Sequence, residues 1–224
     1  MNPSHNPFEV SYRPKGYYSN QRREMVCFIP IDTNKILDIG CGSGEFGEYL
    51  KSKRKVEAWG IEICKEVAEE AMAKLDRVLI GDIENDNIQL PPNYFDCIIF
   101  NDVLEHLKYP WIVLRKMRDY LKPDGYIVAS IPNVRYFNNV KNLLKDKEWT
   151  YRDEGILDKT HIRFFTEKGI KDMFNICEYR VVRIEGIRGI EFPWKFRLFN
   201  RIMLRAFEDM RYLQFAIVAQ KINS

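Results

Sequence analysis

The sequence predicts an α/β fold in which helices cover both faces of a doubly wound, seven-stranded, mostly parallel sheet. Three observations support this prediction. From residue 35 onward, short apolar runs rich in β-branched residues alternate with longer segments of helical periodicity. The first apolar run leads directly into a glycine loop and then into a helical segment. No repeat, Ser/Gly linker or block of like charges divides the chain, so one domain is expected over residues 35–224.

The predicted strands are short apolar segments bounded by turn residues. Five of them alternate with helical segments, and two more close the sheet: Lys35–Ile39, Glu57–Ile61, Arg77–Ile80, Phe95–Phe100, Tyr126–Ser130, Arg180–Glu185 and Gln214–Gln220. Helices are expected between the first strands, over Gly44–Ser52, Lys65–Lys74 and Ile112–Leu121. The turn Lys122–Gly125, which contains Pro and Gly, stops the last of these helices.

Three segments fall outside this alternation. Residues 1–34 form an N-terminal arm, and insertions follow at 132–166 and 186–212. Long connections in compact domains are often functional, so we expect the two insertions to act as lids where substrate chemistry takes place.

Composition excludes several classes of protein. With 46% hydrophobic residues the chain can bury a substantial core. A net charge of +3, from 35 Lys and Arg against 32 Asp and Glu, is too small to indicate a nucleic-acid partner. The five cysteines are widely spaced and contain no Cys-x-x-Cys pair, which argues against a disulfide framework. No apolar run reaches the roughly 18 residues of a membrane span. We therefore expect a reduced, cytoplasmic protein.

The glycine loop after the first strand predicts a ligand site. Gly40, Gly42 and Gly44 allow the backbone to turn sharply and to approach a ligand closely. Glu45 follows them at the start of the next helix, where a negative charge opposes a pyrophosphate. A ligand with a charged amino group and no phosphate tolerates that acid.

The stretch Asp38–Gly44, Asp-Ile-Gly-Cys-Gly-Ser-Gly, resembles motif I of class I S-adenosylmethionine-dependent methyltransferases. The resemblance covers residues 36–132, with segments similar to motif IV (Phe95–Leu107) and to the motif after it (Leu121–Val128) in the family's order. It implies the Rossmann-like methyltransferase fold and S-adenosylmethionine as cofactor, with S-adenosylhomocysteine as product. Glu62 matches the acid that holds the ribose hydroxyls, a role that suits a carboxylate, and Asp82 matches the acid near the adenine amine.

The implied cofactor site draws on all of these motifs and on the N-terminal arm. Asp38 either orients the methionine end of the cofactor through water or caps the following loop, and Cys41 is interpreted as a small loop residue without an activated thiolate. The arm is expected to fold over the methionine end, where Arg22 can engage a carboxylate. The full predicted set is Tyr17, Arg22, Asp38, Gly40, Cys41, Gly42, Gly44, Glu62, Ile63, Asp82, Ile83, Asn101 and Val103.

A second, narrower resemblance concerns the first insertion. Residues 156–166 and 132–136, with Tyr17, Tyr18 and Arg22 in the arm, resemble a subgroup of bacterial methyltransferases associated with surface-polysaccharide biosynthesis. This resemblance does not identify a substrate, but the expected acceptor is a small molecule such as a nucleotide-linked or lipid-linked sugar. The leading hypothesis is therefore O-methylation of a sugar or another small hydroxyl compound.

A hydroxyl acceptor must lose a proton as it attacks, which calls for a general base. Two histidines lie in suitable segments, namely His161 in the first insertion and His106 after motif IV. We favour His161, whose neighbours Lys159 and Arg163 suit an anionic substrate; the alternatives are that it only pins the insertion to the sheet and that His106 packs beneath the sheet edge. No metal is expected, because adjacent helix residues such as Glu105 and His106 point apart and no third ligand is evident.

The second insertion contains a basic amphipathic pattern. Phe196, Phe199, Met203 and Phe207 recur at helical spacing among Lys and Arg residues. The helix either packs on its own domain, covers the active site, forms a dimer face or rests on a membrane surface. The chain is thus expected to be a monomer or homodimer, with peripheral membrane contact as one alternative.

Two other functions compete with this hypothesis. A nucleic-acid methyltransferase is disfavoured, because the sequence Asn101–Leu104 lacks the Asn/Asp-Pro-Pro-aromatic pattern of enzymes that methylate base amino groups. A nucleic-acid partner is therefore not expected. The other competing function is that of a cofactor-binding scaffold protein without catalytic activity.

Overall fold

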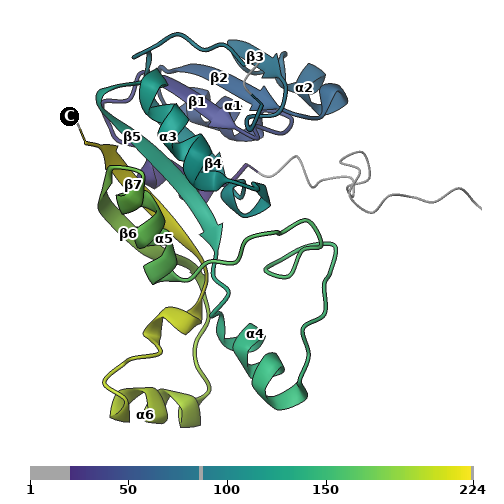
Figure 1. The fold of residues 1–224 in the computed structure, drawn as a ribbon, viewed down its shortest axis with the longest axis vertical. Helices are drawn as coiled ribbons and strands as arrows, with labels where there is room; N and C mark the ends of the chain where they lie inside the picture. Colours follow the sequence, from purple (N-terminus) through teal and green to yellow (C-terminus); the bar gives the residue numbers. More distant parts are fainter. Residues whose placement is uncertain (1–20, 86–87, 223–224) are drawn as a thin grey trace, which may run out of the picture.

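A computed structural model describes residues 21–85 and 88–222, and its sheet confirms the predicted fold (Figure 1). The seven strands lie in the order β3-β2-β1-β4-β5-β7-β6. Their bounds are β1 Lys35–Ile39, β2 Glu57–Glu62, β3 Arg77–Ile80, β4 Phe95–Asn101, β5 Leu121–Pro132, β6 Tyr179–Gly189 and β7 Tyr212–Lys221. The predicted role of Tyr17, and the rest of the arm before residue 21, lies outside the described residues.

The sheet is parallel except at β7, which runs antiparallel to both β5 and β6. Parallel pairs join β3 to β2, β2 to β1, β1 to β4 and β4 to β5. The turn predicted at Lys122–Gly125 is an irregularity inside β5: Phe95 pairs with Leu121, whereas Cys97 pairs with Tyr126. The carboxyl ends of β1, β2 and β4 therefore meet at one edge of the sheet, which is where such folds bind ligands.

Two hydrophobic cores lie on opposite faces of the sheet. Adjacent strand residues point to opposite faces, so Leu37 belongs to one core and Ile36 to the other. The first core is covered by α3 (Pro110–Tyr120) and α5 (Glu167–Ile176). The second is covered by the 3-10 helix η2 (Arg23–Phe28), by α1 (Glu45–Lys53) and by the end of α2 (Lys65–Ala71).

Helix α5 was not among the helices expected from the sequence, although its signals are local. Thr166 caps the helix, since its side-chain oxygen accepts a hydrogen bond from Gly169 N at 3.1 Å. Ile170, Met173 and Phe174 follow at helical spacing and are buried in the first core. The helix separates the first insertion from β6 and closes that face of the sheet.

The two insertions form short helices that lie together at the lower end of Figure 1. The first insertion contains α4 (Phe137–Lys141), continued by a π-helical turn, and the second contains α6 (Trp194–Ile202). The Phe137 ring of α4 lies 4.6 Å from the Phe196 ring of α6. The helix expected up to Phe207 is shorter than predicted, because Leu204 and Arg205 have left-handed backbone angles (φ 51° and 62°). In residues 21–85 and 88–222, no helix is long and apolar enough to cross a bilayer.

A close approach between β2 and the loop after β1 leads to a stability prediction. A Cβ atom on Gly60 would lie 2.5 Å from Cys41 Sγ and 2.8 Å from Leu75 Cδ1. Gly60→Ala should therefore lower the free energy of unfolding by about 1–3 kcal/mol, as overpacking does, measured by urea denaturation. Gly169→Ala, where the added Cβ meets only Thr166 Oγ1 at 3.4 Å in α5, should raise it by about 0.5–1 kcal/mol. Equal effects of the two substitutions would contradict the crowding at Gly60.

Candidate active site

The glycine loop has the backbone conformation that its glycines permit. Gly40, Gly42 and Gly44 have φ angles of 67°, 54° and 83°, in the left-handed region that favours glycine. The Gly40 N–H donates to Ile61 O at 2.8 Å, which ties the loop to the end of β2. A Cβ atom on Gly40 would lie 2.8 Å from Val103 Cγ2. The loop after β1 and the segment after β4 are therefore in direct contact.

Glu62 is buried at the end of β2, where its carboxylate is hydrogen-bonded to the glycine loop. Its Oε2 accepts a hydrogen bond from Gly42 N at 3.0 Å, and its Oε1 accepts one from Cys64 N at 2.9 Å. Each carboxylate oxygen can accept two hydrogen bonds. The predicted ribose-binding acid is thus fixed in orientation by two backbone N–H groups and retains acceptor capacity.

Two polar side chains at the ends of β1 and β4 have buried atoms without hydrogen-bond partners among the described residues. These atoms are Asp38 Oδ1 and both side-chain amide atoms of Asn101. Burial, reinforced by the nearby charge of Glu62, raises the pKa of Asp38 to about 8. Because buried polar groups normally find a partner, these atoms fit a polar ligand bound at this edge.

The predicted adenine side lies at the end of β3. The Asp82 carboxylate accepts a hydrogen bond from Glu84 N at 2.9 Å, which fixes the turn after the strand. Ile83 is buried and Ile63 is about half exposed. Since Glu62 and Ile80 are paired neighbours in β2 and β3, the two predicted acids follow adjacent strands at one edge of the sheet.

Cys41 and Glu45 complete the loop. Burial raises the pKa of the Cys41 thiol, which agrees with a small loop residue rather than a reactive thiolate. Glu45 is paired with Lys74 at 2.7 Å, and Lys74 also donates to Ser43 O. This cation offsets the negative charge at the start of α1, so Glu45 opposes a phosphate less strongly than expected from the sequence.

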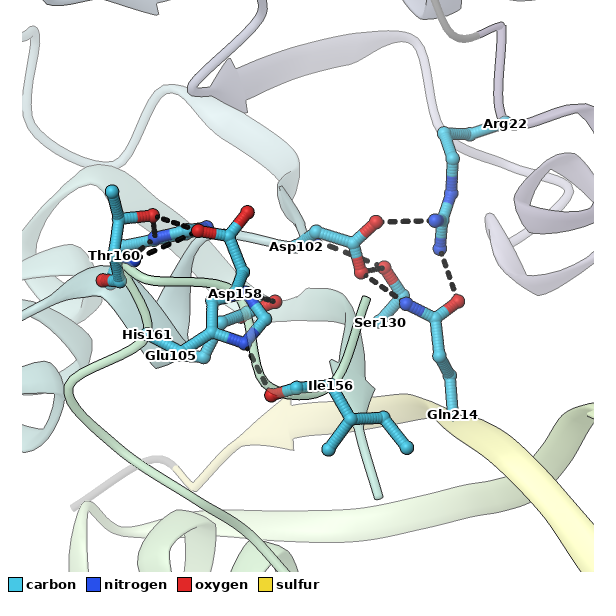
Figure 2. Close-up of polar contacts among 10 residues, drawn as sticks. Arg22, Asp102, Glu105, Ser130, Ile156, Asp158, Thr160, His161 and Gln214 are labelled. Atoms are coloured by element: carbon cyan, nitrogen blue, oxygen red, sulfur yellow. Dashed lines mark hydrogen bonds and ion pairs between the residues drawn. The ribbon is translucent and has the colours of Figure 1, made fainter. Parts of the chain in front are cut away.

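Arg22 is buried in a polar network that joins the N-terminal segment to three strands (Figure 2). Its guanidinium pairs with Asp102 and donates to Gln214 Oε1. Asp102 Oδ1 accepts hydrogen bonds from Gln214 Nε2 at 2.7 Å and from Ser130 Oγ at 3.1 Å. The cation predicted to meet the cofactor carboxylate therefore already has a carboxylate partner, and its contact with the cofactor stays a prediction.

The two candidate bases lie next to each other, with ring centroids 4.6 Å apart. His161 Nδ1 lies 2.9 Å from Ile156 O, and His106 Nδ1 lies 3.2 Å from Thr160 O. A carbonyl oxygen only accepts hydrogen bonds, so each neutral ring carries its proton on Nδ1 and its lone pair on Nε2. The contact of Thr160 with His106 also fastens the first insertion to the segment after β4.

Glu105 completes this cluster. Its carbonyl accepts hydrogen bonds from Ile162 N and Arg163 N, which tie the insertion to Glu105. Its carboxyl is fully buried, and neither oxygen has a hydrogen-bond partner among the described residues. Burial, followed by the negative charge of Asp102, raises the pKa of Glu105 well above its usual range. Glu105 Oε1 lies 3.9 Å from His161 Nε2.

This arrangement corrects one step of the sequence argument. The expectation of no metal site depended on the lack of a third ligand beside Glu105 and His106. His161, which is 55 positions away from His106, supplies that donor, and one potential ligand atom of each residue lies within 4.8 Å of the others. Sequence spacing gave no signal of this proximity.

The cations expected beside an anionic substrate have other partners. Lys159 pairs with Asp153 at 2.6 Å and is more than half exposed. Arg163 donates to Lys108 O and lies over the Trp111 ring. Arg163 therefore ties the insertion to the segment after β4, whereas the Lys159–Asp153 pair lies within the insertion.

Comparison with known proteins agrees with the fold. A family model described as "Methyltransferase domain" matches residues 16–184. A ubiquinone biosynthesis O-methyltransferase of Neisseria meningitidis is 27% identical over 105 residues, and the match spans 44% of each chain. The mitochondrial enzyme of that name from Schizosaccharomyces pombe is 38% identical over 48% of this chain and 40% of its own.

Solved structures show the same fold. A SAM-dependent methyltransferase from Archaeoglobus fulgidus superposes with a TM-score of 0.64 at 23% identity, covering 88% of this chain and 91% of that one. A possible histamine N-methyltransferase from Thermotoga maritima superposes with a TM-score of 0.62 at 17% identity, covering 89% and 87%. The chain belongs to the methyltransferase-domain family. Its fold is that of the class I, S-adenosylmethionine-dependent methyltransferases.

Proposed function

We propose that the protein transfers a methyl group from S-adenosylmethionine to a hydroxyl oxygen of a small molecule. One observation carries the proposal: Val103 packs on Gly40 of the cofactor loop, and Glu105 and His106 follow within three residues, in contact with the first insertion. The predicted cofactor edge and the histidine cluster therefore lie beside each other in the fold.

On the cofactor side, the residues bind and orient. S-adenosylmethionine supplies an electrophilic methyl group attached to a sulfonium. We assign the ribose hydroxyls to Glu62, the adenine to Asp82 with Ile83 and Ile63, and the methionine end to Asp38 and the arm that carries Arg22 and Tyr17. The loop glycines, with Cys41, Asn101 and Val103, shape the space between them. The unpartnered atoms of Asp38 and Asn101 support this assignment.

On the acceptor side, the first insertion (132–166) is the lid, and His161 is the general base with His106 as the second candidate. The Nε2 lone pair of His161 takes the hydroxyl proton while the oxygen attacks the methyl carbon. The pair of electrons in the broken carbon–sulfur bond stays on sulfur. Support comes from the tautomer that Ile156 O imposes on His161, and His106 is the one other histidine among the described residues.

The acceptor class rests on two lines of support. The motif resemblance favours a sugar hydroxyl, and the curated relatives are named for O-methylation in ubiquinone biosynthesis; none of the relatives compared supports the polysaccharide subgroup. A screen should therefore offer nucleotide-linked sugars, lipid-linked sugars and hydroxyl compounds related to ubiquinone synthesis, with S-adenosylhomocysteine release as readout. Methylation of amines or nucleic acids alone, with no hydroxyl acceptor, would overturn the proposal.

Glu62 provides the test on the cofactor side. Glu62→Ala should weaken S-adenosylmethionine binding by about 1.5–3 kcal/mol, the typical contribution of hydrogen bonds to a charged group, measured by titration calorimetry. Glu66→Ala, an exposed acid in α2, is the matched control and should bind normally. Because Glu62 also supports the glycine loop, circular dichroism must show that the variant is folded. Wild-type affinity in a folded Glu62→Ala protein would refute the ribose assignment.

A further inference from the structure

We propose that Glu105, His106 and His161 form a binding site for one divalent first-row transition-metal ion, such as Zn²⁺ or Mn²⁺. One potential ligand atom from each residue lies within 4.8 Å of the other two. The inference rests on the proposed function only in placing this cluster beside the acceptor. Ion binding itself requires no turnover and can be measured on the protein alone.

The histidines are oriented as metal ligands usually are. Metal-bound imidazoles almost always donate their other ring N–H to a carbonyl or carboxylate, which fixes the tautomer. Here His161 Nδ1 meets Ile156 O at 2.9 Å. His106 Nδ1 meets Thr160 O at 3.2 Å and Thr160 Oγ1 at 3.0 Å, while that hydroxyl itself donates to Asp158 Oδ1. Both rings therefore carry their lone pair on Nε2.

Glu105 is the second, independent observation. Its side chain is 1% exposed, and both carboxyl oxygens lack a hydrogen-bond partner among the described residues. The separation of 3.9 Å between Glu105 Oε1 and His161 Nε2 is too long for a hydrogen bond. It is shorter than about 4.2 Å, the sum of two metal–ligand bonds of about 2.1 Å. An ion between these atoms would satisfy an otherwise orphaned buried carboxyl.

The remaining geometry requires a modest adjustment. Two ligands with bonds of about 2.1 Å lie about 3.4 Å apart in a tetrahedral site, so the widest separation in the trio, at most 4.8 Å, must shorten by up to about 1.4 Å. Two imidazoles and one carboxylate suit zinc, manganese, iron or cobalt better than calcium or magnesium, which prefer oxygen ligands alone. The donor set thus selects the class of ion.

A cation at this place would change how the acceptor is activated. It would lower the pKa of a hydroxyl that approaches it. An imidazole whose lone pair holds an ion cannot accept a proton at the same time. In the ion-loaded protein, the hydroxyl would therefore lose its proton to solvent water, because the ion lowers its pKa, and not to His161.

The test is to titrate chelator-treated protein with Mn²⁺ and to follow the free ion by electron paramagnetic resonance, with Zn²⁺ calorimetry as a second measurement. We expect one ion per chain. Glu105→Gln and His161→Gln should each weaken binding at least tenfold, whereas Glu66→Gln, which removes an exposed acid in α2, should not. Glu105→Gln keeps the size of the side chain, and His106→Gln adds a less buried variant, so loss of binding can be separated from loss of fold.

The outcomes distinguish this inference from the proposed function. Absence of stoichiometric binding to the wild type, or equal binding by the wild type and the three cluster variants, overturns the ion site. Full turnover of chelated protein together with no Mn²⁺ binding also overturns it and leaves methylation in place. Stoichiometric, cluster-dependent binding without any methylated hydroxyl acceptor supports the ion site and counts against the proposed function alone.

Discussion

Replacing His161 by alanine is expected to lower turnover about 10²–10⁴-fold, the usual contribution of a general base, while S-adenosylmethionine affinity stays close to that of the wild type. The reason is the separation of roles along the chain. The predicted cofactor contacts come from the N-terminal arm and from the ends of β1, β2, β3 and β4, whereas His161 lies in the first insertion against Glu105 and Ile156. Turnover with an identified acceptor and calorimetry with the cofactor together measure the effect.

Two further variants make this result interpretable. His161→Gln keeps a hydrogen-bond donor for Ile156 O but offers no base, so it should lose turnover like His161→Ala without the same loss of packing. Lys159→Ala, in the same insertion but paired with Asp153 at the surface, should turn over normally. If His161→Ala and His106→Ala both turned over at wild-type rates, the acceptor would need no base and the hydroxyl assignment would lose its mechanistic support.

The strands and the cofactor loop could be predicted because their signals are local. A mostly apolar run such as Phe95–Asn101 is buried along nearly its whole length, so its pattern is visible in the sequence. The glycines at 40, 42 and 44 are required by the left-handed backbone of one short loop. Local patterns did not predict that α6 ends at Ile202, before residues with left-handed backbone angles. They also did not predict α5, although the Thr166 cap marks its start.

The histidine cluster could be predicted only in part, because it depends on contacts between distant segments. His106 and His161 were each recognisable as candidate bases, but their neighbourhood is created when Ile162 N and Arg163 N bond to Glu105 O. A buried carboxyl such as Glu105 has no signature of its own in a sequence with 30% charged residues. The pairing of Arg22 with Asp102, 80 positions apart, was invisible for the same reason.

Asp38→Asn is expected to remove a large pH dependence of stability. The pKa of Asp38 is about 8 in the folded protein and about 3.9 in an unfolded chain. Between these values the folded state retains a proton that the unfolded state releases. The free energy of unfolding therefore falls as pH rises, by up to about 1.4 kcal/mol per pH unit from this group, and changes no further above pH 8.

The measurement is urea denaturation of the wild type and of Asp38→Asn at pH 5, 6, 7 and 8. The contributions of the other titratable groups cancel in the difference between the two free energies of unfolding. The wild type should lose stability relative to the variant across this range. Asp76→Asn is the matched control. Partial burial raises the pKa of Asp76, but Lys51 and the Ala58 N–H lower it by more, so the pKa lies below its usual value. The difference in stability between wild type and Asp76→Asn should therefore stay flat above pH 5. A flat difference for Asp38→Asn would mean that Asp38 is ionised in the folded protein.

The same raised pKa links Asp38 to the cofactor. A positively charged amino group placed beside Asp38 favours the ionised carboxylate, so binding of S-adenosylmethionine below pH 8 should release a proton. Calorimetry at pH 7 in buffers of different ionisation enthalpy detects that release. Asp38→Asn should abolish it, because the amide has no proton to lose. Binding without proton release in the wild type would place the methionine end of the cofactor away from Asp38 and favour the loop-capping role instead.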